Sequence, residues 1–120
     1  MIDSLIPPQL MEPLMRLGSW KPLRPGVDKL TLGLGLDGEE VALLRYAPGA
    51  WVPEHKHPGR ETLLMLEGVQ ADQGGSYGAG ALKIMEVGTQ HSLNSETGCL
   101  LLIHWAKPVR FVEDLEEIGN

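Results

Sequence analysis

The sequence has little of several residue types, and each shortage excludes a class of protein. Its single cysteine, Cys99, cannot form an intramolecular disulfide, which excludes a secreted scaffold built on disulfide bonds. Ten lysines and arginines stand against sixteen aspartates and glutamates, giving a net charge of −6. So acidic a chain lacks the positive charge that binds nucleic acid or an anionic membrane surface, and we expect neither as a partner.

The sequence also lacks long hydrophobic runs and a secretory signal. The longest purely aliphatic run covers residues 100–103, which is far shorter than a membrane span. Asp3 stands in the N-terminal region where a signal peptide carries basic residues. We therefore expect a cytoplasmic protein.

What the sequence does contain is turn-forming residues. Fifteen glycines and nine prolines are scattered over 120 residues, a distribution typical of short strands joined by tight turns within one all-β domain. Leucines alternate with other residues from Leu30 to Leu36, Asp37-Gly38 is a two-residue hairpin signal, and residues 41–47 form the returning strand. Further strands are expected at residues 61–67, 81–87, 99–106 and 109–112, within an antiparallel sandwich or barrel of eight or nine strands.

The two ends of the chain differ from this pattern. Leu10, Leu14 and Leu17 have helical spacing, and the nearby prolines limit any helix to about two turns. We expect residues 1–26 to be an irregular or helical arm, residues 27–112 the barrel, and residues 113–120 an acidic tail. The arm lies over the barrel, crosses to a second subunit, or is a poorly ordered leader.

Three histidines and one glutamate form the candidate site. Side chains two apart in a strand point to one side, so His55 and His57 present their imidazoles to the same space. Pro58-Gly59 turns the chain back so that Glu61 can meet them, and His91 arrives from a distant segment after a glycine turn. Imidazole and carboxylate together are the ligands of a divalent transition metal. Four such ligands leave one or two positions of an octahedron open for water or substrate.

Other residues near this stretch have more than one interpretation. Trp51, Leu63 and Met65 are candidates for an apolar pocket wall, although the tryptophan can equally serve packing. Arg45 can pair with an anionic substrate group, or it can be an exposed strand residue in a structural ion pair. Cys99 is expected in the core. For His104 the expected role is that of an ordinary strand residue, with a place near the metal as the alternative.

At this point the sequence resembles the cupin superfamily. The first cupin motif is matched at every position, by Gly49, His55, His57, Glu61 and Gly68. The second motif is matched by Gly80, Gly88 and His91, with Glu86 in place of the usual proline and Ser95 in place of the usual asparagine. The resemblance implies a single-domain cupin β-barrel, or jelly-roll sandwich, and a metal held by His55, His57, Glu61 and His91.

Within the cupins, the chain is similar to the cupin domain of ChrR anti-sigma factors. The likeness covers residues 26–106 and rests mainly on residues 44–50, residues 66–69 and Gly98-Cys99. Thr62 stands where that subfamily has a second acid, next to the retained Glu61. In ChrR proteins the domain binds zinc and accompanies a separate helical domain that holds a sigma factor. Residues 1–26 lack the metal-ligand His and Cys of that domain, so sigma-factor binding by this chain alone is not expected.

The resemblance leaves three functions open. The first is a metal-dependent enzyme of the dioxygenase kind, similar to the single-domain cupins that cleave diketones or aryl ketones with Fe(II) and O2. In it Glu61 or the metal itself acts on a small oxygenated substrate. The second is a non-catalytic zinc-binding or ligand-sensing module that acts through a protein partner. The third is a structural domain. Fe(II) and Zn(II) are the first candidates for the metal, followed by Mn(II) and Ni(II), and a homodimer is expected.

Overall fold

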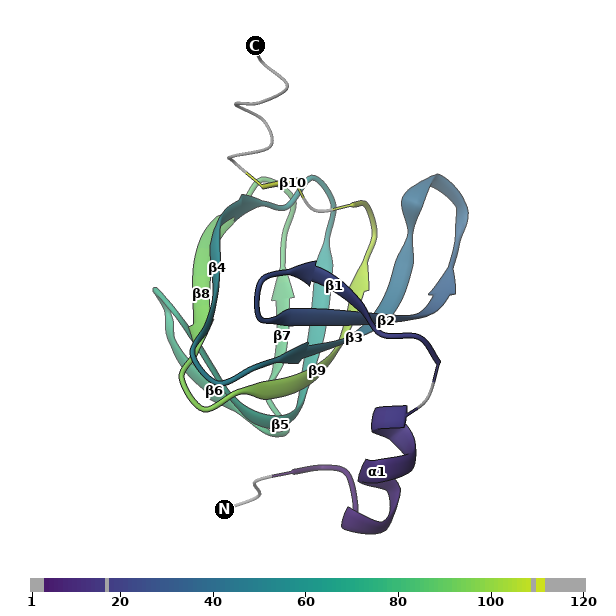
Figure 1. Ribbon diagram of the computed structural model, residues 1–120. Coiled ribbons are helices and arrows are strands. Elements are labelled where there is room, and N and C mark those ends of the chain that lie inside the picture. Colours follow the sequence, from purple (N-terminus) through teal and green to yellow (C-terminus); the bar gives the residue numbers. More distant parts are fainter. Residues whose placement is uncertain (1–3, 17, 109, 112–120) are drawn as a thin grey trace.

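In the part of the chain that the structure describes, ten strands form one strongly curved sheet that curls into a nearly closed barrel, and a short helix lies outside it (Figure 1). This computed structural model describes residues 4–16, 18–108 and 110–111. In chain order the elements are α1 (Pro8–Arg16), β1 (Lys21–Arg24), β2 (Val27–Leu34), the 3-10 turn η1 (Leu36–Gly38), β3 (Glu40–Tyr46), β4 (Ala50–Lys56), β5 (Glu61–Asp72), β6 (Gly75–Gly78), β7 (Leu82–Met85), β8 (Gln90–Ser95), β9 (Cys99–Trp105) and β10 (Arg110–Phe111).

Strand β5 joins the two walls of the barrel. The strand order is β1-β2-β3-β9-β5-β8-β4-β10, and all the pairings are antiparallel. The first part of β5 pairs with β9 and β7, whereas its last residues pair with β6 and β8. Gly68 lies between these parts at a φ of +81°, and a Cβ there would collide with the backbone at Gly98. The closing glycine of the first motif thus lets one strand turn from one wall to the other.

The predicted hairpin between β2 and β3 is confirmed. Asp37 and Gly38 have φ values of +60° and +83°, as a two-residue type I′ turn requires, and the amide of Glu39 donates to the carbonyl of Leu36 at 3.2 Å. The alternating leucines do not all lie against the barrel, however. Leu34 and Leu36 are 76% and 89% exposed because the hairpin projects beyond the barrel wall.

The predicted two-turn helix is α1, and it lies over the barrel. Its Met11, Leu14 and Met15 pack against an outer cluster that includes the buried Leu30 and Leu43. Within the predicted arm, residues 21–24 form β1, which pairs with β2 across the expected boundary at residue 26. Their sequence, Lys-Pro-Leu-Arg, shows no alternation that would indicate a strand. Leu17 and the expected tail 113–120 lie outside the described residues.

The main core fills the barrel interior. Inward-facing side chains of β3, β5 and β9 are nearly all buried, and Met65 and Leu101 have no exposed surface. Cys99 belongs to this core, and burial raises the pKa of its thiol to about 11, so its predicted packing role is confirmed. Among the described residues, no helix has the length and apolar character needed to cross a membrane.

Candidate metal centre

A β-bulge in β4 brings two of the predicted histidines together. Val52 lies opposite Leu93 of β8, and His55 lies opposite His91. Between these two pairs β4 has two residues and β8 has one, so β4 contains one extra residue. The bulge includes Pro53, which has no backbone N–H group and so cannot donate a hydrogen bond to the neighbouring strand. Without it Glu54 would oppose His91 and His55 would point outward, because a shift of one residue reverses a strand's faces.

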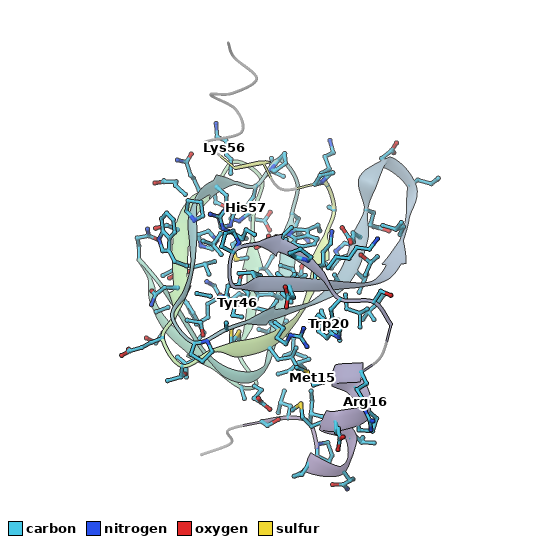
Figure 2. All side chains as sticks on the ribbon, viewed as in Figure 1. Met15, Arg16, Trp20, Tyr46, Lys56 and His57 are labelled. Carbon is cyan, nitrogen blue, oxygen red and sulfur yellow. The ribbon has the colours of Figure 1, made fainter. Side chains whose placement is uncertain are left out.

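The three histidines meet at one end of the barrel interior. His57 directly follows β4, and its ring centroid lies 5.2 Å from that of His55 and 4.9 Å from that of His91. One ring nitrogen of each histidine lies within 4.8 Å of the others. His55 is 4% exposed and His57 1% exposed. Figure 2 shows His57 inside the upper end of the barrel, close to Lys56 at the end of β4.

Each histidine has an acceptor at its outer nitrogen. Nδ1 of His55 lies 3.0 Å from the carbonyl oxygen of Pro53, which can only accept. Nδ1 of His91 lies 3.3 Å from a carboxylate oxygen of Asp72. Nδ1 of His57 lies 2.7 Å from the hydroxyl of Thr89, whose own proton goes to the carbonyl of Glu86. All three Nδ1 atoms therefore carry the proton, and all three Nε2 atoms keep their lone pairs.

These lone pairs converge without a proton between them. Nε2 of His91 lies 3.1 Å from Nε2 of His55, and two lone pairs at that separation repel unless a cation lies between them. Nε2 of His57 is buried and has no hydrogen-bond partner among the described residues. Three neutral imidazoles with their lone pairs turned inward are the donor set a divalent transition metal requires, so the residues present fit such an ion.

Glu61, the fourth residue predicted from sequence, lies beside His57 but is not part of the group of three converging ligand atoms. One carboxylate oxygen accepts a hydrogen bond of 2.6 Å from the indole of Trp105, and the other lies 3.5 Å from Nε2 of His57. Burial raises the pKa of Glu61 to about 7, although the bond from Trp105 opposes this. A buried carboxylate with one oxygen turned to the histidines is stabilised by a cation at their centre.

Burial also prepares the histidines for a metal by keeping them neutral. Desolvation, together with the neighbouring rings, lowers the pKa of His57 to about 4. Desolvation lowers the pKa of His55 to about 4 as well, and the pKa of His91 is lowered by burial and by Lys83. The imidazoles are therefore unprotonated at neutral pH, the state in which they can donate a lone pair.

Asp72 is held in place by a network that sequence reasoning missed. Its carboxylate pairs with Lys83 and accepts hydrogen bonds from the Tyr77 hydroxyl at 3.1 Å and the Gly74 amide at 2.7 Å. Although burial opposes it, these bonds lower the pKa of Asp72. In the sequence Asp72 stands at the start of a hairpin turn, and this turn alone explains why an aspartate is found there. Nothing in the sequence therefore indicates its contact with His91.

A cavity of about 160 Å³ adjoins the histidines, and only some of the predicted pocket residues line it. Leu63 lines this cavity, together with His55 and Glu61. Met65 is instead packed in the core, and Trp51 is 57% exposed on the outside. Arg45 pairs with Asp28 at 3.1 Å and lies 4.1 Å from the ring of Trp20, so it forms a structural ion pair beside α1. The pocket interpretation of Arg45, Trp51 and Met65 does not fit these positions.

The fourth histidine lies away from the cluster. His104 faces outward on β9, where its Nε2 lies 3.1 Å from a carboxylate oxygen of Glu39. Its side chain is 39% exposed. The structure thus places His104 as an ordinary surface residue of its strand.

Comparison with known proteins places this site in a family. The model of the ChrR cupin-like domain matches residues 15–108. The anti-sigma-E factor ChrR of Cereibacter sphaeroides is 36% identical over 95 residues, which are 77% of this chain and 44% of the relative. This chain therefore spans less than half of that curated relative.

Solved structures share the fold. The Rhodobacter sphaeroides SigE complex with the anti-sigma ChrR matches with a TM-score of 0.66 at 24% identity, covering 88% of this chain and 69% of that chain. An acetylacetone dioxygenase from Acinetobacter johnsonii matches with a TM-score of 0.72 at 16% identity, covering 80% of this chain and 73% of that chain. Because both sequence identities are below 25%, these two matches show a shared fold and nothing about shared function.

One prediction about partners needs correction. Sigma-factor binding was not expected because residues 1–26 lack a sigma-binding domain, but a chain that spans 44% of its relative gives no basis for that argument. The relative is itself an anti-sigma factor, and a structure of the anti-sigma ChrR in complex with SigE is among the similar ones, so this expectation is withdrawn. The motifs, the barrel and the family match agree: this chain belongs to the ChrR cupin-like domain family.

Proposed function

We propose that this chain is a regulatory metal-binding cupin domain of the ChrR type, which holds a divalent metal and acts through a protein partner of the sigma-factor class. The metal ligands in this proposal are His55, His57, Glu61 and His91. The observation that carries it is the convergence of three Nε2 lone pairs whose outer nitrogens all have acceptors. The partner class rests on the anti-sigma relative.

Zn(II) is the metal that suits this role best. Zinc accepts imidazole and carboxylate ligands and has no redox chemistry, so a closed set of protein ligands makes it a structural ion. Fe(II), Mn(II) and Ni(II) accept the same donors, and metal analysis separates them. When bound, the ion supplies Lewis acidity, and iron adds the activation of O2.

The position of β4 offers a path from the metal to a partner. His55 and Lys56 pair with Phe111 and Arg110 of β10, the strand at the edge of the sheet. A ligand bond at His55 therefore restrains the strand on which this edge is built. Metal occupancy changes how firmly the edge is held, and edge strands are common sites of protein–protein pairing.

An enzyme is the second candidate, because a cavity adjoins His55 and Glu61 and can admit a small oxygenated substrate to a metal there. In that case the domain is a metal-dependent oxidoreductase similar to the dioxygenases. Consumption of O2 on a diketone or an aryl ketone by the iron-loaded protein would favour this candidate. Zinc without turnover favours the regulatory domain.

A homodimer and a barrel unit at residues 27–112 stay predictions. The mass of the protein in solution tests the first, and limited proteolysis tests the second.

The test of the metal site compares two histidine variants by elemental analysis of protein purified without added metal. We expect about one metal ion per wild-type chain and none in His91→Ala, because a ligand is lost. His104→Ala is the matched control and keeps its metal, since that side chain pairs with Glu39 on the surface. Full metal content in His91→Ala would refute the assignment, and failure of zinc to alter binding of a sigma factor would refute the regulatory role.

A further inference from the structure

Gln70 is a buried polar residue that the metal centre does not use. It lies on β5 with its side chain in the barrel interior, and it is 1% exposed. Neither the oxygen nor the nitrogen of its amide has a hydrogen-bond partner among the described residues. Buried amides are almost always paired, because an unpaired one has lost its water without replacement. An amide unpaired at both ends therefore points to a binding role.

The space beside Gln70 is the 160 Å³ cavity, which is lined mostly by apolar side chains such as Leu44, Leu93 and Leu101. The lining also holds two basic residues, Arg24 and Lys29, and two acidic residues, Glu40 and Glu61, so its charged groups are balanced in number. Lys29 pairs with Glu40 at 3.1 Å, and Glu61 accepts from Trp105. The Gln70 amide is thus an uncharged polar group in this wall that is left for a ligand to satisfy.

We propose that this cavity binds a small, flat, uncharged organic molecule with an adjacent hydrogen-bond donor and acceptor, such as a primary carboxamide, and that the Gln70 amide recognises this pair. The oxygen of Gln70 accepts from the ligand's N–H group, while its nitrogen donates to the ligand's carbonyl oxygen. A cavity of about 150 Å³ lined by aliphatic and aromatic residues holds a benzene ring, so an aryl carboxamide has a suitable size.

The same geometry disfavours two related molecules. A carboxylate has no donor, so one of its oxygens would face the oxygen of Gln70 and repel it. A hydrocarbon of equal shape would leave both ends of the amide unpaired, and sites built to hydrogen-bond a ligand reject analogues that lack the group. The expected order of affinity is therefore benzamide, then benzoate and toluene.

This inference deepens the proposed function, because such a molecule is what a regulatory domain with this cavity would sense. Binding to Gln70 does not itself require the metal, and the two ideas are tested separately. The metal content of the protein decides the first. Calorimetric titration of the metal-free protein with benzamide, benzoate and toluene decides the second.

We expect benzamide to bind metal-free wild-type protein about tenfold or more tightly than toluene, since two hydrogen bonds are gained. In Gln70→Leu the order should reverse, and the variant should melt at a higher temperature than wild type because no buried amide is left unpaired. Gln70→Met, which keeps an unbranched side chain of similar length, is a second test should leucine not fit the wall. Gln73→Leu is the matched control, since Gln73 is exposed and bonded to Ser92, and it should retain the wild-type order.

Three results would overturn the proposal. They are no saturable binding of benzamide to the wild-type protein, tighter binding of benzoate than of benzamide, or an unchanged order of affinity in both Gln70 variants. A melting temperature lowered in both variants would also overturn it, because the amide would then be a structural group. Loss of metal in the His91 variant with retained benzamide binding would support the cavity independently of the metal.

Discussion

The histidine cluster and Gln70 are two buried polar regions of one barrel, and they differ in how their polar atoms are satisfied. Each histidine has an acceptor at its outer nitrogen and an unshared lone pair only at Nε2. Within the described part of the chain, Gln70 has a hydrogen-bond partner at neither end of its amide. The first region holds its side chains in fixed orientations, whereas the second relies on packing alone.

This difference indicates which kind of ligand suits the unsatisfied polar atoms of each region. In the histidine cluster they all point to one centre, which suits a single ion bound by several ligands. At Gln70 they lie on one flat group facing a cavity with polar and apolar lining residues, which suits an organic molecule. A region with many partners should be sensitive to the loss of each, and the following predictions test this from the largest expected effect to the smallest.

Acid should destabilise the metal-free protein by about 2 kcal/mol between pH 6.5 and pH 4.5. His55 and His57 have folded pKa values of about 4, below their ordinary 6.5, so the unfolded chain binds more protons and stability falls as the pH falls. Glu61 acts in the opposite direction, because its pKa is raised from 4.5 to about 7. These two histidines against one glutamate leave the unfolded chain with slightly less than one extra bound proton on average, which corresponds to about 1 kcal/mol per pH unit. The lowered pKa of His91 acts in the same direction as those of His55 and His57.

Urea unfolding at a series of pH values measures this slope. Glu61→Gln removes the opposing group, so its slope in the same interval should approach twice that of wild type. Zinc-loaded protein should show no such slope until the metal leaves, and it should keep its metal well below pH 6.5 because the folded histidines resist protonation. A flat profile for the metal-free protein would contradict the burial-driven pKa shifts.

Asp72→Asn should weaken zinc binding by about 10- to 100-fold, the usual cost of losing a carboxylate that orients a metal-bound histidine. The charged acceptor for Nδ1 of His91 is lost, and Lys83 loses its partner as well. Competition with a chelating dye measures the affinity. The absorption spectrum of the cobalt-substituted protein reports the change in ligand orientation.

Two controls separate orientation from stability in this experiment. Asp28→Asn removes a carboxylate that pairs with Arg45 away from the site, and it should leave zinc affinity unchanged. Asp72→Asn combined with Lys83→Met removes the unpaired buried charge, so it should recover stability but not affinity. Recovery of both would mean that Asp72 serves only the fold.

Much of this site was predictable from the sequence, because the spacing of His55, His57 and Glu61 is local and the turn at Pro58-Gly59 is visible. The same holds for the hairpin at Asp37-Gly38, whose turn residues determine its backbone angles. The structure adds the bulge at β4, which decides that His55 and His91 face each other. Pro53 within a strand is the signal that could have indicated it.

Other features could not be predicted, because they depend on contacts between distant strands. Asp72 reaches His91 across the β5–β8 pairing, and nothing in its own turn sequence indicates this. The cavity at Gln70 and the outward position of Trp51 likewise follow from how the walls close. Strand β1 has no apolar alternation, and it forms because its backbone pairs with β2.

Thr89→Val should have the smallest effect, a weakening of zinc binding of about three- to tenfold, because the lost acceptor is a neutral hydroxyl worth about 0.5–1.5 kcal/mol. Valine keeps the shape of threonine but leaves Nδ1–H of His57 without the hydroxyl that now accepts it. Thr89→Ser is the control, since it retains the hydroxyl and should keep most of the affinity. The same chelator competition that measures Asp72→Asn ranks the two acceptors directly. Should Thr89→Val weaken zinc as much as Asp72→Asn, the charge of Asp72 would contribute nothing beyond a hydrogen bond.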